Sequence, residues 1–225
     1  MNLLDTMNLL KLGGPVVLVL LVMSVVGLAV VFYKLIQYRR YSSAMISRVD
    51  QAVNTWAGGD VKGALALLER ERGPFGQLLL SGMGWLADSG PDEQKIREEL
   101  TRRGQKIMAQ INSLNPLLEQ IAYLAPLLGL LGTVLGIIDV FHGLASDGGG
   151  ADTGILAGGI WEALLTTAVG LVVAIPFALV HAILDGRAIR IRSSMEDQIT
   201  RLFTVDLYRA GAAAGTGKSS AGTGK

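Results

Sequence analysis

The 225-residue sequence is 50% hydrophobic and only 17% charged, and it contains no cysteine. Soluble domains carry about 25% charged residues, so this chain is short of solubilising groups. Its net charge of +1 at pH 7 provides no basic field for nucleic-acid binding, and the absence of cysteine excludes disulfides and thiolate chemistry. The apolar residues therefore need an environment other than a single soluble core.

Three uncharged runs hold much of this apolar content, at residues 12–33, 121–138 and 163–180. A helix needs about 20 residues to cross the hydrocarbon layer of a membrane, and the second and third runs reach this length with their neighbours. Buried core helices are the alternative, but three such runs are hard to bury in a chain of this size. The sequence therefore predicts an all-α membrane protein with transmembrane helices at residues 12–33, 120–144 and 161–184.

Lysine and arginine are distributed unevenly around these predicted spans. Residues 34–119 hold 12 of them and residues 185–225 hold seven, whereas residues 145–160 hold none and residues 1–11 hold one. Basic residues concentrate on the cytoplasmic side of a membrane. We therefore predict a multi-pass protein of a bacterial inner membrane, in which residues 1–11 and the turn at 145–160 are periplasmic and the C-terminus is cytoplasmic.

The segment between the first two spans, residues 34–119, is predicted to form a small helical cytoplasmic domain. Glycine and proline stops divide its first part into three helices, at residues 42–56, 61–72 and 75–87. A capping-box pattern that begins at Ser89 then predicts the start of a further helix.

An apolar seam with a 3.5-residue period follows this start and continues into the second span. One long helix is therefore expected from residue 91 to residue 144, with kinks at Pro116 and Pro126. A similar extension, residues 185–210, follows the third span. Both helices are thus predicted to project into the cytoplasm, and the Gly/Ala/Ser/Thr-rich residues 211–225 are predicted to be disordered.

The sequence offers no support for an enzyme. Gly217, Lys218 and Ser219 resemble the end of a phosphate-binding loop, but Ala212 replaces the first glycine of that motif and no strand precedes it. We find no pair of nucleophile and base and no cluster of metal ligands. We therefore expect no covalent catalysis, no cofactor and no metal.

Small residues share one face of each of the last two predicted spans when side chains are placed at about 100° per residue. These residues are Gly129, Gly132, Thr133 and Gly136 in the second span and Ala163, Thr167, Gly170 and Ala174 in the third. Such faces let helices pack closely. Two roles remain open for the threonines: bonding back to carbonyls of their own helix, or lining a polar path.

Three ionisable residues lie near the ends of these spans. Asp139 and Glu162 lie towards the predicted periplasmic side and His181 lies towards the cytoplasmic side. Charges within a span usually face a bundle interior or a water-filled path, although residues at the headgroup level merely end a span. No span carries an acid near its middle. If the protein moves ions, we expect another subunit to supply the titrating carboxylate.

Two segments together resemble the signature spans of the ExbB/TolQ family, which is related to MotA. They read APLLGLLGTVLGI at residues 125–137 and GIWEALLTTAVGL at residues 159–171, and the second is followed by Ala174-Ile175-Pro176. The resemblance implies an inner-membrane stator subunit driven by the proton-motive force. It implies a homopentamer around a dimer of a single-span ExbD/TolR-like partner, whose membrane aspartate is the missing acid.

The resemblance also implies roles for individual residues. Thr133 and Thr167 would line the ion path and Glu162 would lie near its outer mouth. Thr166, Asp139 and His181 are accessory candidates from their positions alone, and Asp139 departs from relatives, which commonly have a neutral polar residue there. The expected coupling ion is H⁺, with Na⁺ left open. The output would pass through a TonB- or TolA-like protein to TonB-dependent transport or the Tol-Pal machinery. A gliding-motility motor, a passive membrane scaffold and a stand-alone channel remain alternatives.

Overall fold

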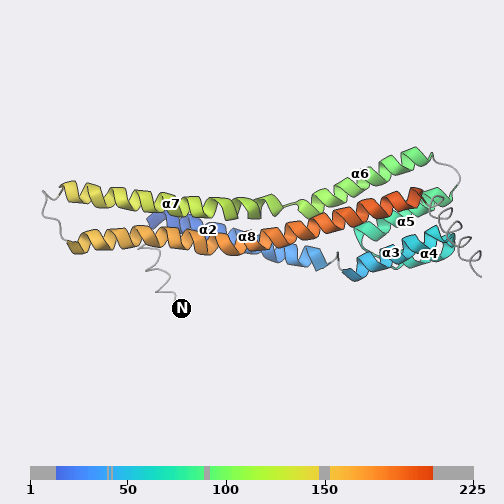
Figure 1. Cartoon of the computed structure of the whole chain (residues 1–225), viewed down its shortest axis with the longest axis horizontal. Coiled ribbons are helices and arrows are strands. Elements are labelled where there is room, and N and C mark those ends of the chain that lie inside the picture. The colour runs from blue at the N-terminus through green and yellow to red at the C-terminus, as the bar shows by residue number, and fades with distance from the viewer. Residues whose placement is uncertain (1–13, 40, 42, 89–91, 147–152, 205–225) are drawn as a thin grey trace, which may run out of the picture. The chain divides into compact units, whose positions relative to one another are not determined.

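The structure is a computed structural model, and it describes residues 14–39, 41, 43–88, 92–146 and 153–204. Every regular element in these residues is an α-helix, as predicted. The helices are α2 (Gly14–Arg39), α3 (Ser43–Ala57), α4 (Val61–Glu69), α5 (Pro74–Ala87), α6 (Glu93–Asn112), α7 (Asn115–Ser146) and α8 (Thr153–Phe203) (Figure 1). The predictions for residues 1–11 and 211–225 lie outside the described residues.

Three segments of the described chain contain helices that are long and apolar enough to cross a membrane. They correspond to α2, α7 and α8, and α8 alone is 51 residues long. Large apolar side chains cover the outer sides of these helices: Val25 is 61% exposed, Ile138 is 55% exposed and Val172 is 71% exposed. A helix that is apolar all round suits a membrane rather than water.

The chain divides into two compact units. The first contains α2 as far as Lys34, α7, and α8 as far as Asp185. Its buried core includes Leu20 of α2, Ala125 of α7 and Ala174 of α8. These residues bring all three apolar helices into one packed cluster, and this unit holds every candidate residue of the predicted ion path.

The second unit contains the rest of α2, helices α3 to α6, and α8 from Gly186. Helix α3 packs on α4, α4 on α5, and α5 on α6. The core side chains Val49, Leu68, Leu79 and Leu100 are fully buried. The three short helices predicted for this segment are thus confirmed, with bounds that differ by a few residues.

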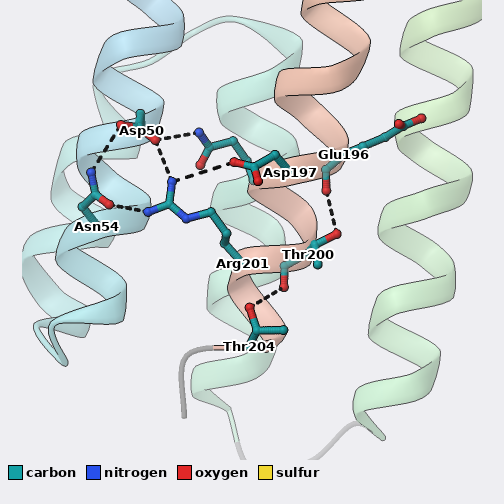
Figure 2. Close-up of polar contacts among 8 residues, drawn as sticks. Asp50, Asn54, Glu196, Asp197, Thr200, Arg201 and Thr204 are labelled. Atoms are coloured by element: carbon teal, nitrogen blue, oxygen red, sulfur yellow. Dashed lines mark hydrogen bonds and ion pairs between the residues drawn. The ribbon is translucent and has the colours of Figure 1, made fainter. Parts of the chain in front are cut away.

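A polar cluster of Asp50, Asn54, Gln198 and Arg201, which we call the Asp50 cluster, holds α3 against α8 within the second unit (Figure 2). The carboxylate of Asp50 accepts from Nε2 of Gln198 at 2.9 Å and from Nη1 of Arg201 at 2.8 Å. The guanidinium of Arg201 also donates to the side chain of Asn54. Because the Arg201 side chain is only 19% exposed, its charge is compensated by this cluster rather than by water alone.

The single helix predicted from residue 91 to residue 144 is wrong, because α6 ends at Asn112 and α7 begins at Asn115. Leu114, between them, has a left-handed backbone with φ of 66°. Proline lacks a backbone N–H, and its ring clashes with the carbonyl four residues earlier in a helix. For Pro116 that carbonyl belongs to Asn112, where α6 ends. Helix α7 continues through Pro126.

Two other predicted boundaries differ from the structure. Helix α6 is capped by Asp92, whose side chain accepts from the backbone N–H of Gln94, while Ser89 lies outside the described residues. Helix α8 begins at Thr153, so the second half of the predicted turn at residues 145–160 is helical. The predicted turn was placed by the positions of charged residues. Apolar residues such as Ile160 continue helix α8 into the second half of that turn.

Candidate ion-path site

Helices α7 and α8 approach each other closely along their glycine faces. A Cβ added to Gly170 would lie 2.6 Å from the carbonyl oxygen of Ala125 and 3.1 Å from Cα of Gly129. A Cβ added to Gly129 would lie 2.9 Å from the carbonyl oxygen of Thr166. Only a residue without a side chain fits at these two positions, since the neighbouring atoms belong to the backbone.

The same face continues towards the end of α7. A Cβ on Gly132 would lie 2.6 Å from Oγ1 of Thr166, and one on Gly136 would lie 2.9 Å from Cβ of Ala163. The residue numbers rise on α7 as they fall on α8, so the two helices are antiparallel at this contact. The space left by Gly132 therefore receives the hydroxyl of Thr166.

Three threonine hydroxyls converge on one carbonyl oxygen at this contact. The carbonyl oxygen of Gly129 lies 3.0 Å from Oγ1 of Thr167, 3.1 Å from Oγ1 of Thr166 and 3.2 Å from Oγ1 of Thr133. We call Thr133, Thr166 and Thr167 the hydroxyl cluster. Thr166 is 4% exposed, whereas Thr133 and Thr167 are half-buried.

The hydroxyl cluster has more acceptors than protons. Oγ1 of Thr166 lies 2.7 Å from the carbonyl oxygen of Ala163, and Oγ1 of Thr133 lies 3.3 Å from it. The hydroxyls of Thr133 and Thr167 also hydrogen-bond to each other. Each hydroxyl has one proton to donate and two lone pairs to accept with. The three protons therefore have several arrangements, and the cluster is able to change its direction of hydrogen bonding without gaining a charge.

The structure shows how the threonines are hydrogen-bonded, while their role in lining a polar path stays a prediction. Thr133 bonds back to Gly129 on its own helix, as an isolated threonine does. Both Thr133 and Thr167 also bond across the interface, Thr133 to the carbonyl oxygen of Ala163 and Thr167 to that of Gly129. Thr166 is predicted only as an accessory residue, and it lies about 100° away from Thr167 around the helix. Gly132, which lies opposite Thr166, is the sequence signal for the contact between these two residues.

The predicted ionisable residues are not hydrogen-bonded to the hydroxyl cluster. Asp139 is exposed, and Glu162 and His181 are half-buried. Along their helices Asp139 lies about 9 Å from Thr133, and Glu162 lies about 8 Å from Thr167. His181 lies about 21 Å from Thr167 in the opposite direction. The antiparallel packing puts Asp139 and Glu162 towards the same end of the α7–α8 pair.

Over the part of the chain that the structure describes, no group of histidine, aspartate and glutamate side chains is arranged to hold a metal ion. The polar groups of the site are thus neutral hydroxyls and carbonyls.

Residues 70–197 match the model of the MotA/TolQ/ExbB proton channel family. The matched segment is more than half of the chain and includes every candidate site residue. The chain belongs to this family, and the resemblance seen in the sequence is confirmed.

Three curated relatives illustrate the match. The putative biopolymer transport protein ExbB-like 1 of Synechocystis is 36% identical over 178 residues, which are 76% of this chain and 67% of that protein. The biopolymer transport protein ExbB of Salmonella typhimurium is 32% identical over 177 residues, 73% of this chain and 69% of its own. The Tol-Pal system protein TolQ of Pseudomonas aeruginosa is 37% identical over 86 residues, 38% of this chain and 35% of its own.

Proposed function

We propose that this protein is an ion-conducting stator subunit of an inner-membrane motor driven by the proton-motive force. The observation that carries the proposal is the hydroxyl cluster, in which Thr133 and Thr167 meet between two apolar helices. Membership of a proton channel family supports it. The cluster offers groups that accept and donate hydrogen bonds without carrying a charge that would trap an ion.

The titrating carboxylate is proposed to come from a partner. Asp139 and Glu162 lie towards one end of the α7–α8 pair and not at the level of the cluster. As the resemblance to the ExbB/TolQ family implies, we propose that a homopentamer of this chain surrounds a dimer of a single-span ExbD/TolR-like protein with an aspartate in its span. One elementary charge that crosses 100 mV releases about 2.3 kcal/mol, which is enough to bias a conformational step of the complex.

In this proposal Glu162 lies near the outer mouth of the path and Asp139 and His181 are accessory groups. The N-terminus is periplasmic and the C-terminus is cytoplasmic. The output is mechanical work passed through a TonB- or TolA-like protein. The relatives named for biopolymer transport and for the Tol-Pal system support an output of this kind, ahead of gliding motility.

The test replaces Thr133 and Thr167 with valine in the host bacterium, separately and together. Valine keeps the volume of threonine and removes its hydroxyl. We expect the double variant to co-purify with the ExbD/TolR-like partner at the wild-type ratio. The output that depends on this gene, either TonB-dependent uptake or outer-membrane integrity, should fall by at least about 90%.

Thr101→Val is the matched control, because Thr101 is exposed on α6 and its hydroxyl bonds back to the carbonyl oxygen of Arg97 on the same helix. It should behave as wild type in both assays. Full energised output in Thr133→Val/Thr167→Val would favour the passive scaffold instead. Repeating the uptake assay with Na⁺ replaced by K⁺ distinguishes the coupling ion: a proton-driven motor keeps its output.

A further inference from the structure

The second unit contains a cavity of about 890 Å³, separate from the hydroxyl cluster, which belongs to the first unit. Its walls come from Tyr38 at the end of α2, from Tyr41, from the start of α3, and from α8 between Arg187 and Asp197. This volume falls within the roughly 300–1,000 Å³ typical of sites for small molecules. We call it the arginine cavity.

The arginine cavity has an apolar floor and a basic rim. Two of its lining side chains are buried: Tyr38 is 7% exposed and Ile191 is 4% exposed. Arg187 and Arg190 are exposed at the rim, three residues apart on one face of α8. Neither arginine makes an ion pair with any residue that the structure describes. Their charges are thus available to an anion.

The carboxylate that also lines the cavity does not cancel this charge. Asp197 lies 3.9 Å from Nη1 of Arg201, on the side of α8 that faces the Asp50 cluster (Figure 2). It is ten residues from Arg187 and seven from Arg190, so the nearer arginine is about 10 Å away along the helix. At that distance and next to another cation, Asp197 leaves the arginine end of the cavity positive.

The cavity residues follow directly after the apolar runs. On α2 the uncharged run ends at Tyr33, five residues before Tyr38. On α8 the uncharged run ends at Val180, seven residues before Arg187. These intervals are about 8 and 11 Å of helix. In a membrane-spanning chain they correspond to the depth of the headgroups, where tyrosine is enriched and arginine reaches phosphates.

We infer that the arginine cavity binds the phosphodiester headgroup of an anionic phospholipid of the cytoplasmic leaflet. The guanidinium groups of Arg187 and Arg190 donate charge-assisted hydrogen bonds to phosphate oxygens. Hydroxyl donors are present at Tyr41 and Ser194 on the same walls. The inference rests on insertion of the chain in a membrane and not on ion conduction, so its test is independent of the stator proposal.

The test measures binding of dihexanoyl phosphatidylglycerol to the purified full-length protein in a neutral detergent. Dihexanoyl phosphatidylcholine and inorganic phosphate are measured alongside. We expect saturable binding of the anionic lipid, at least about tenfold tighter than binding of either comparison probe. Arg190→Gln should weaken it about tenfold, since a charge-assisted pair is worth about that factor, and Arg187→Gln/Arg190→Gln should abolish it.

Arg192→Gln is the matched control: Arg192 lies two residues from Arg190, pairs with Glu196 at 3.3 Å and does not line the arginine cavity. It should leave affinity unchanged. Equal binding of both lipids, equal binding of inorganic phosphate, or the same loss in Arg192→Gln would overturn the inference. So would a change of oligomeric state in Arg187→Gln/Arg190→Gln, measured by light scattering, because the cavity would then be a contact between copies.

Discussion

The hydroxyl of Thr167 in α8 donates to the carbonyl oxygen of Gly129 in α7, with 3.0 Å between the two oxygens. This bond joins two helices whose outer surfaces are apolar, and Gly129 has no side chain to hinder it. Its geometry depends on the close approach of Gly129 and Gly170. Packing and polar chemistry at the site are therefore coupled: a change that separates the helices also opens the hydroxyl cluster.

Gly170→Ala should separate the helices. The added methyl would meet the carbonyl oxygen of Ala125 and Cα of Gly129, which are backbone atoms and cannot move aside locally. Overpacking of this kind costs about 1–3 kcal/mol, and we expect a lower thermal midpoint in detergent. Gly158→Ala on the same helix is the control, since nothing lies within 4 Å of its Cβ position. Equal midpoints for both variants would contradict the close contact.

Leu114→Gly should stabilise the protein. Leu114 has a φ of 66°, which costs a residue with a side chain about 1–2 kcal/mol, and glycine removes that cost at an entropic expense of about 0.5–1 kcal/mol. Leu117→Gly is the control, because it is similarly exposed, at 38% against 42%, but lies inside α7. Thermal unfolding should move in opposite directions in the two variants, and a drop in both would rule out strain at Leu114.

The Asp50 cluster should make the second unit sensitive to acid. The hydrogen bond from Gln198, helped by Arg201 and Asn54 and opposed by burial, holds the pKa of Asp50 below its ordinary value of 3.8. The folded-state pKa is depressed, so the stabilisation is fully present above that ordinary value and is lost as the pH falls through the lower, folded-state pKa.

Thermal midpoints at pH 7, 5 and 3 test this effect of Asp50. The difference between wild type and Asp50→Asn should be the same at pH 7 and 5 and should be smaller at pH 3. Glu99, whose pKa is lowered to about 2 by hydrogen bonds from Arg102 and then Arg103, titrates in both proteins and cancels in the comparison. A gap that stays constant down to pH 3 would show that the charge of Asp50 does not stabilise the cluster.

Glu71→Gln should destabilise the packing of the small helices. The Glu71 side chain is only 9% exposed and is paired with Nε of Arg48. A hydrogen bond to a charged group is worth about 1.5–3 kcal/mol, and part of this is lost when glutamine replaces the carboxylate. Glu69→Gln, at an exposed position on α4, is the control for the same chemical change, and denaturant midpoints of the two variants should differ clearly.

Much of the architecture follows from sequence periodicity. Uncharged runs identified the three apolar helices, and glycine and proline stops identified α3, α4 and α5. The break between α6 and α7 was missed because the apolar seam continues past it. The period of an apolar seam indicates which face of a helix is buried. It does not indicate whether the helix backbone is continuous. Pro116 carried the correct signal, since its ring opposes a helical carbonyl at Asn112.

The candidate site was predictable in part. The small-residue faces of both helices are visible in the sequence, and they meet in the structure. The convergence of three hydroxyls on the carbonyl of Gly129 was not predictable, because it depends on the register between α7 and α8. One residue of slip would turn Thr166 away from Gly132. Periodicity within each helix contains no information on that register.

The measurement that tests the central claim most directly is proton uptake into vesicles that contain this protein with its ExbD/TolR-like partner. A membrane potential is imposed and the internal pH is recorded for wild type, Thr133→Val/Thr167→Val and Thr101→Val. Our account predicts partner-dependent uptake in wild type and in Thr101→Val, and at least about tenfold slower uptake in the double variant. Uptake at the wild-type rate without the two hydroxyls would contradict it.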